Sequence, residues 1–180
     1  LPQILRHNAR FDLTKLNWLN GEYVREMNDQ RFYELSIHAL SRAGLDTNRF
    51  PVAYVKAALD TCKGKFKLFG ELPAYAGFYF KDEVVYDPEA AKKDFIPENK
   101  PRLLKLREVF AQLEPFEPDP IGNALKTAAQ ELGVKAGVLV HPTRLACCGA
   151  TAGPSLYHLL AILGKEKALR RMDRAIELMA

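Results

Sequence analysis

The sequence predicts an all-α protein built in two parts. Apolar residues recur at helical spacing along nearly the whole chain, and no run shows the strict alternation of a half-buried β-strand. Glycine and proline separate these periodic stretches, as expected for short helices joined by turns. With 180 residues, of which 48% are hydrophobic, the chain is long enough to bury a substantial core.

The first part is expected to cover residues 1–80 and to contain three helices. A polar or proline residue just before an apolar turn marks a helix start, because such residues suit the free amides of the first turn. Glycine marks helix ends, since it adopts the left-handed cap without strain. By these signals the helices start next to Asp12, Asp29 and Pro51. Gly21 is expected to end or bend the first helix, and the other two are expected to end at Gly44 and about Cys62.

The second part is expected to cover residues 81–180. Between residues 71 and 100 three prolines and a dense aromatic cluster interrupt the periodic pattern, so we place the boundary near Phe80 and Lys81. We interpret the aromatic residues as packing material that joins the two parts. Four helices are predicted beyond this segment, at 102–113, 121–132, 155–163 and 165–179, and the segment bracketed by Pro142 and Pro154 is interpreted as a separator.

The last of these helices is expected to be amphipathic. Its apolar residues recur at helical spacing, which predicts one buried face and a solvated set of basic residues. The predicted buried set is Leu169, Met172, Ile176 and Met179, and the predicted solvated set is Arg170, Arg171 and Arg174.

The bulk composition narrows the class of protein. A net charge of +4 and a pI near 8.9 favour an acidic partner without identifying it. No apolar run approaches the roughly 18 to 20 residues of a membrane span, so no membrane partner is expected. Cys62, Cys147 and Cys148 lack the spacing of a zinc or redox pair, and we expect them to be reduced packing residues of a cytoplasmic protein.

No constellation in the sequence points to catalysis by this chain alone. The histidines are scattered without a convincing metal-ligand pair, and His38 is interpreted as a packed or surface residue. The Gly-Lys pairs at Gly64 and Gly164 lack the spacing of a phosphate-binding loop. A nucleophile at Cys147 or Cys148 would have no base within the same motif. We therefore expect no catalytic residue, no metal site and no cofactor in this chain.

One lysine-rich segment has the composition of an RNA-binding surface. Its lysines interleave with aromatic residues just after an expected helix end, and single-stranded RNA is bound by cations together with flat surfaces. The alternative is a solvated helix terminus, where cations suit the helix dipole. The lysines are Lys56, Lys63, Lys65 and Lys67, and the aromatic residues are Phe66 and Phe69.

A second segment, residues 141–157, combines an arginine with a rigid corner. Arg144 precedes the Gly153-Pro154 pair, so a guanidinium and an exposed backbone turn could meet at one splayed nucleotide. The alternative is an ordinary turn in which the proline starts the next helix. Composition alone favours that alternative.

Two longer motifs favour RNA binding over these structural alternatives. The front carries FDLTKLNWLNGEYVR (residues 11–25), and the end carries HPTRLACCGATAGPSLYHLLAILGKEKALRR (residues 141–171). In order and spacing they resemble the start and end of the anticodon-binding region of bacterial-type glutamyl-tRNA synthetases, from about Arg10 to Ile176. The resemblance implies a two-part α-helical cage, with Trp18 anchoring the core and the Asn20-Gly21 pair shaping a turn.

The same resemblance implies which residues read the tRNA. In related synthetases an arginine and a Gly-Pro-x-Leu corner lie against the anticodon, and a basic residue senses the third anticodon base. Here these are Arg144, Gly153, Pro154, Leu156 and Lys65. Lys65 keeps the charge of the family's arginine but lacks its planar fork. Lys56 and Lys63 are expected to add contacts to the tRNA, and a Cys-Cys pair at 147–148 replaces the usual Leu-Thr.

The resemblance therefore implies the C-terminal, tRNA-binding portion of a glutamate-tRNA ligase. The chain is expected to bind the anticodon arm of glutamate tRNA. The parent enzyme is expected to be a monomer that activates glutamate with ATP and Mg in an upstream catalytic domain. The alternative is a helical protein-interaction module that has kept a synthetase-like scaffold without reading RNA.

Overall fold

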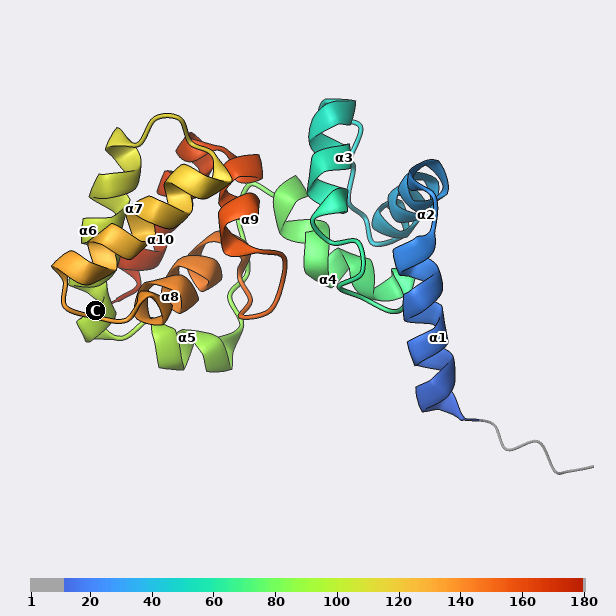
Figure 1. The fold of residues 1–180 in the computed structure, drawn as a ribbon, viewed down its shortest axis with the longest axis horizontal. Coiled ribbons are helices and arrows are strands. Elements are labelled where there is room, and N and C mark those ends of the chain that lie inside the picture. The colour runs from blue at the N-terminus through green and yellow to red at the C-terminus, as the bar shows by residue number, and fades with distance from the viewer. Residues whose placement is uncertain (1–11, 180) are drawn as a thin grey trace, which may run out of the picture.

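Two groups of helices make up the protein (Figure 1). The computed structural model describes residues 12–179, and all regular secondary structure in that range is helical, which confirms the predicted all-α class. The first lobe contains α1 to α4 and η2, and the second contains α5 to α10. The chain passes between them in segment 81–87, where the boundary was predicted; that these are separate folding units stays a prediction. No helix among the described residues is both long enough and apolar enough to span a membrane.

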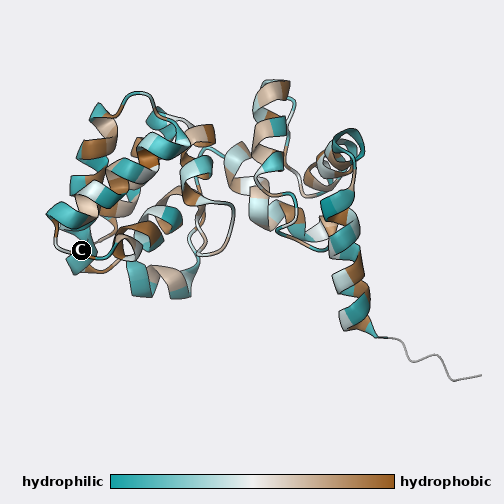
Figure 2. Cartoon of the chain, viewed as in Figure 1, coloured by the Kyte–Doolittle hydropathy of each residue, from teal (hydrophilic) through white to brown (hydrophobic). Residues whose placement is uncertain are grey.

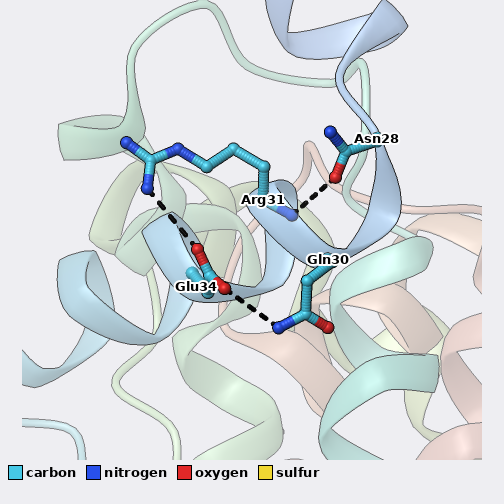
Figure 3. Close-up of polar contacts among 4 residues, drawn as sticks. All are labelled: Asn28, Gln30, Arg31 and Glu34. Carbon is cyan, nitrogen blue, oxygen red and sulfur yellow. Dashed lines mark hydrogen bonds and ion pairs between the residues drawn. The ribbon is translucent and has the colours of Figure 1, made fainter.

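The first lobe begins with α1 and α2, and both start close to the predicted positions. Asp12 caps α1, its Oδ1 accepting from the Lys15 amide at 3.0 Å. The predicted start of α2 is close but its cap is Asn28, whose Oδ1 accepts from the Arg31 amide at 2.9 Å (Figure 3). The elements of this lobe are α1 (Leu13–Glu26), α2 (Asp29–Arg42), α3 (Val52–Asp60), η1 (Phe69–Glu71), α4 (Leu72–Ala76) and η2 (Gly77–Phe80).

One exposed turn of α2 is also linked through its side chains. Glu34 accepts from Gln30 Nε2 at 3.0 Å and from Arg31 Nη1 at 3.4 Å (Figure 3). Residues three and four apart on a helix lie side by side, so these contacts support the first turns of α2 from the solvent side. Because these side chains are exposed, solvent screens the contacts and their contribution to stability is small.

Two expectations for α1 are wrong. The helix runs through Gly21 rather than ending there, and Asn20 does not shape a turn but donates to the Lys67 carbonyl. Trp18 is not a core anchor, because its side chain is 57% exposed. The first turns of α1 project away from the other helices of the lobe (Figure 1), and nothing within residues 12–179 buries the apolar side chains of these turns. Hydrophobic residues accordingly lie along the free part of the helix (Figure 2).

The second lobe contains one long helix that the sequence did not predict. Residues 136–148 form α8, which continues through Pro142 although proline removes one backbone donor. Pro142 is buried, and beside it the Thr143 hydroxyl donates to the Leu139 carbonyl at 2.6 Å. The elements of this lobe are α5 (Pro88–Asp94), η3 (Pro97–Asn99), α6 (Lys100–Gln112), α7 (Pro118–Glu131), α8 (Ala136–Cys148), α9 (Leu156–Leu163) and α10 (Lys165–Glu177).

The aromatic cluster at residues 78–80 joins the two lobes, as predicted. Tyr79 is fully buried, and its ring is tilted against that of Phe78 at a centroid distance of 4.1 Å and edge-on to that of Phe80 at 6.4 Å. Its backbone carbonyl accepts from Tyr54 of the first lobe at 3.0 Å and from Lys167 of the second at 3.1 Å. The last turn of the first lobe is therefore bonded to both lobes.

The orientation of α10 is predicted correctly except at one arginine. Met172, Ile176 and Met179 are buried, and Leu169 is half-buried against the core. Arg170 and Arg174 are exposed. The expectation that Arg171 is solvated is wrong, because only 2% of this residue is exposed. Arg171 is buried because its guanidinium donates to backbone carbonyls at the ends of other helices.

Candidate nucleic-acid interface

Lys65 lies in an exposed turn just beyond α3. The Thr61 hydroxyl donates to the Ala58 carbonyl at 2.6 Å and closes the helix, and Gly64 takes a left-handed φ of +76°. The Lys65 amide donates to the Cys62 carbonyl at 2.9 Å, which holds the backbone of the turn. The Lys65 side chain is exposed, while the adjacent Phe66 is buried. This turn presents a cation on a fixed backbone, the arrangement needed to meet an RNA backbone or base edge.

Lys63 is held inside the lobe instead. Its Nζ lies 2.7 Å from both the Met27 carbonyl and Asp29 Oδ1, and 5.4 Å from the centroid of the Phe32 ring. The ammonium group of Lys63 lowers the pKa of the Asp29 carboxyl through a hydrogen bond and charge attraction. Lys63 thus joins the α1–α2 corner to the end of α3, and its proposed contact with tRNA phosphate stays a prediction.

Lys56 lies on the exposed side of α3. Its Nζ is 5.4 Å from the centroid of the Tyr33 ring, and both residues line a hollow of about 270 Å³ between α2 and α3. Asp29 and Asp60 line the same hollow, so its charge is mixed. A surface of mixed charge attracts phosphate less than an all-basic one.

Arg144 and the Gly153-Pro154 corner come together in space. Arg144 projects from α8, and its Nη1 donates to the Pro154 carbonyl at 2.6 Å. A Cβ at Gly153 would lie 3.5 Å from the same Nη1, so the arginine passes close over the glycine. Arg144 as a whole is half-buried. The Leu156 side chain is buried, with 4% of the residue exposed, so it supports the corner from within.

Gly149 is a residue of this site that the sequence analysis missed. It ends α8 with a left-handed φ of +80°, and a Cβ there would come within 2.3 Å of the Val85 carbonyl oxygen. The Gly149 carbonyl also accepts from the Asp87 amide at 2.8 Å. Only glycine fits this close approach. A glycine just after a helical pattern is the signal that would have shown it, had α8 been recognised.

The three cysteines of the chain are packing residues, as predicted. Cys62, Cys147 and Cys148 are all free and buried. Burial raises the pKa of the Cys147 thiol to about 12 and of the Cys62 thiol to about 11, and it also raises the pKa of Cys148. Only the thiolate is a good nucleophile, so these shifts lower the reactivity of the three thiols. The described residues hold no group of His, Cys, Asp or Glu suited to a metal ion.

A sequence profile described as an anticodon binding domain matches residues 31–176 of this chain. The chain belongs to the anticodon binding domain family. The match covers both Lys65 and the corner formed by Arg144 and Pro154. In this anticodon binding domain the two predicted contact regions lie on different lobes, one after α3 and one after α8.

Relatives of this anticodon binding domain include glutamate-tRNA ligases. It is 31% identical over 177 residues to glutamate-tRNA ligase 2 of Caldicellulosiruptor saccharolyticus, and 33% identical over 179 residues to that of Moorella thermoacetica. These alignments cover 98% and 97% of the chain but only 37% and 36% of the ligases. The chain therefore spans little more than a third of the length of these relatives.

The fold is also that of a solved ligase structure. The chain superposes on a glutamate tRNA ligase from Elizabethkingia meningosepticum with a TM-score of 0.84 and 22% sequence identity. The superposition covers 99% of this chain and 35% of that protein. The two-lobed arrangement in Figure 1 is thus a shared architecture.

Proposed function

We propose that this chain is the anticodon-reading portion of a glutamate-tRNA ligase and binds the anticodon arm of glutamate tRNA. The observation that carries the proposal is the family match over residues 31–176, together with relatives that are glutamate-tRNA ligases. ATP-dependent activation of glutamate would then take place in a part of the enzyme outside this sequence. We further propose that the parent enzyme is a cytoplasmic monomer that uses ATP and Mg.

Two kinds of contact would contribute to tRNA binding, namely lysine contacts to phosphates and an arginine contact to a base. Lys65 and Lys56 are exposed cations, and lysines near RNA strengthen binding by displacing counterions from phosphates. Arg144 instead has a planar guanidinium with several donors, and one of them is hydrogen-bonded to the Pro154 carbonyl. That bond orients the guanidinium, so its remaining donors point in a defined direction, as reading a base edge requires. The small residues of the corner would let a splayed nucleotide approach.

The direct test is binding of the 180-residue chain to glutamate tRNA and to the same tRNA with a swapped anticodon. We expect tighter binding to glutamate tRNA and a steep fall in affinity with salt. Arg144→Ala should weaken binding to glutamate tRNA by about 1 to 3 kcal/mol and reduce the preference, as for one lost base contact. Lys56→Met should weaken both tRNAs alike and lower the salt slope by about 0.7, the value for one phosphate contact to a single strand.

The outcome of this binding test also distinguishes tRNA binding from the alternative function. A folded chain that binds neither tRNA would refute the proposal and favour a protein-interaction module. If Arg144→Ala leaves the preference intact while circular dichroism shows an unchanged fold, Arg144 only braces the corner. Base reading would then have to be assigned elsewhere, with Lys65 as the next residue to substitute.

A further inference from the structure

Arg171 holds the two lobes together from a buried position. Its Nη2 donates to the carbonyls of Phe78 and Lys81, each at 2.7 Å, and its Nη1 donates to the carbonyl of Cys147. Phe78 lies in η2, the last turn of the first lobe, whereas Cys147 lies in the last turn of α8 in the second lobe. One side chain on α10 therefore bonds to both lobes at once.

The chemistry of this contact depends on the shape of arginine. Carbonyls in the last turn of a helix have no partner within the helix and carry partial negative charge. The forked guanidinium of Arg171 reaches such oxygens on Phe78 and Cys147 and also the Lys81 carbonyl just beyond η2, which the single ammonium of lysine does not reproduce. No acidic side chain is salt-bridged to Arg171 among the residues that the structure describes, so these carbonyls are its counter-charge.

On the first-lobe side, the contact leads directly to the Lys65 turn. Tyr79, next to Phe78 in η2, places its hydroxyl 3.0 Å from the Thr61 hydroxyl. Thr61 closes α3 and lies one turn before Lys65. Lys167, one turn before Arg171 on α10, adds a bond to the Tyr79 carbonyl at 3.1 Å. The backbone that presents Lys65 is thus bonded to the same turn that Arg171 grips.

On the second-lobe side, the contact leads to the corner at Arg144. Cys147 lies one helical turn after Arg144 on α8, and Gly149 ends the helix two residues later. Arg171 thus holds the end of the helix that aims Arg144 at the Pro154 carbonyl. The Lys65 turn and the Arg144 corner lie far apart in the sequence. Arg171 connects the structural elements on which they lie.

We propose that Arg171 is a positioning residue that sets the distance and angle between the Lys65 turn and the Arg144 corner, and so allows both to engage one anticodon loop. Arg171 is buried and would not touch the tRNA itself. This inference rests on the proposed function, since it concerns how that function is arranged across the two lobes. Spatial continuity alone does not establish coupling, so the test must measure the coupling itself.

The experiment uses the 180-residue chain with Arg171→Lys, which keeps the charge but loses the fork, and Arg171→Met, which loses both. Arg170→Lys and Arg170→Met are matched controls, because Arg170 is the exposed neighbour on the same helix. Spin labels on cysteines introduced at Arg42 of α2 and Gln130 of α7, both exposed, report the distance between the lobes. Binding competition between glutamate tRNA and the anticodon-swapped tRNA reports discrimination.

We expect Arg171→Lys to broaden the distance distribution between the lobes and to reduce the preference between the tRNAs by about 2- to 30-fold. The Arg170 variants should change neither quantity. In a double-mutant cycle, Arg171→Lys should reduce the preference between the tRNAs less in an Arg144→Ala background than in the wild type. The reason is that the base-reading side chain whose position Arg171 would set is already removed in that background. If Arg171→Met does not fold, Arg171→Lys alone decides the outcome.

A stability role alone predicts a different result. In that case Arg171→Lys would lower the melting temperature while the folded protein keeps both its distance distribution and its preference, which would overturn the positioning role. The proposed function fails separately: if the wild-type chain shows no preference for glutamate tRNA, that function is refuted and the positioning role falls with it. Additive effects in the double-mutant cycle would also overturn the link between Arg171 and Arg144.

Discussion

Helices α1 and α10 both carry apolar residues at helical spacing, but these residues are exposed on most of α1 and buried on α10. On α10, Met172 and Ala175 are fully buried and even the cationic Arg171 is covered. On α1, Leu13 is 65% exposed and Trp18 is 57% exposed, and Val24 alone among its residues is buried. The difference lies in the neighbours: α10 packs against α6, α8 and α9, whereas the first turns of α1 extend away from the lobe (Figure 1).

This contrast shows what an amphipathic pattern does and does not establish. Periodic apolar residues predict that a helix forms and which of its faces is apolar. They do not say whether another element covers that face. Two consecutive arginines illustrate the same point, because Arg170 is exposed and Arg171 is buried on one helix.

The largest expected effect concerns these two arginines. Arg171→Met should lower the free energy of unfolding by about 3 to 5 kcal/mol, because it leaves several buried carbonyls without a donor. Arg170→Met should change it by less than about 0.5 kcal/mol, as for an exposed side chain. Urea unfolding followed by circular dichroism measures both. Equal effects would mean that α10 is rotated from the orientation described.

The next effect tests the apolar face of α10 directly. Met172 is fully buried, so Met172→Ala should cost about 2 to 5 kcal/mol through lost burial and the cavity left behind. The same urea titration measures this loss, with the half-buried Leu169→Ala expected to cost less. A loss below about 1 kcal/mol for Met172→Ala would indicate that this face is not tightly packed.

A third prediction concerns pH and the basic side of α10. Burial, and then the nearby charge of Arg171, lower the pKa of Lys167 from its ordinary 10.5 to about 8 in the folded protein. The unfolded chain therefore binds more protons at Lys167 between about pH 8 and 10.5, so the contribution of this residue to stability rises across that window.

The measurement is the difference in unfolding free energy between wild type and Lys167→Met at several pH values. We expect the unfolding free energy of the wild type to rise relative to that of the variant between about pH 8 and 10.5. Titrations of the cysteines and tyrosines occur in both proteins and cancel in the difference. A difference that stays flat across this range would show that Lys167 is solvated, and would weaken its assignment to the lobe junction.

The smallest expected effect lies on α1. Trp18→Ser should change the unfolding free energy by less than about 0.5 kcal/mol, because the side chain is largely exposed. Thermal and urea unfolding of the 180-residue chain check this value. A loss above about 2 kcal/mol would show that Trp18 is covered in solution, and would remove the contrast with α10.

Much of the fold was predictable from local signals. Asp12 and Gly44 mark helix ends, since a cap acts through its own side chain or backbone angle and needs no distant partner. Local signals failed at Pro142, where a residue that usually ends a helix lies within α8. They failed because burial on several sides outweighs the loss of one backbone hydrogen bond.

The candidate site likewise has features that the sequence predicts and features that only the tertiary structure decides. The charges and the motif, from Lys65 to the Gly153-Pro154 pair, were visible in the sequence, and so was the family resemblance that assigns them to tRNA. That Arg144 meets Pro154, that Lys63 is bound to Asp29, and that Arg171 is buried were decided only by the tertiary structure. A basic side chain in a sequence carries no sign of its partner, because the acceptors of Arg171 are backbone carbonyls that every residue possesses. Only the packing of distant segments selects which carbonyls it meets.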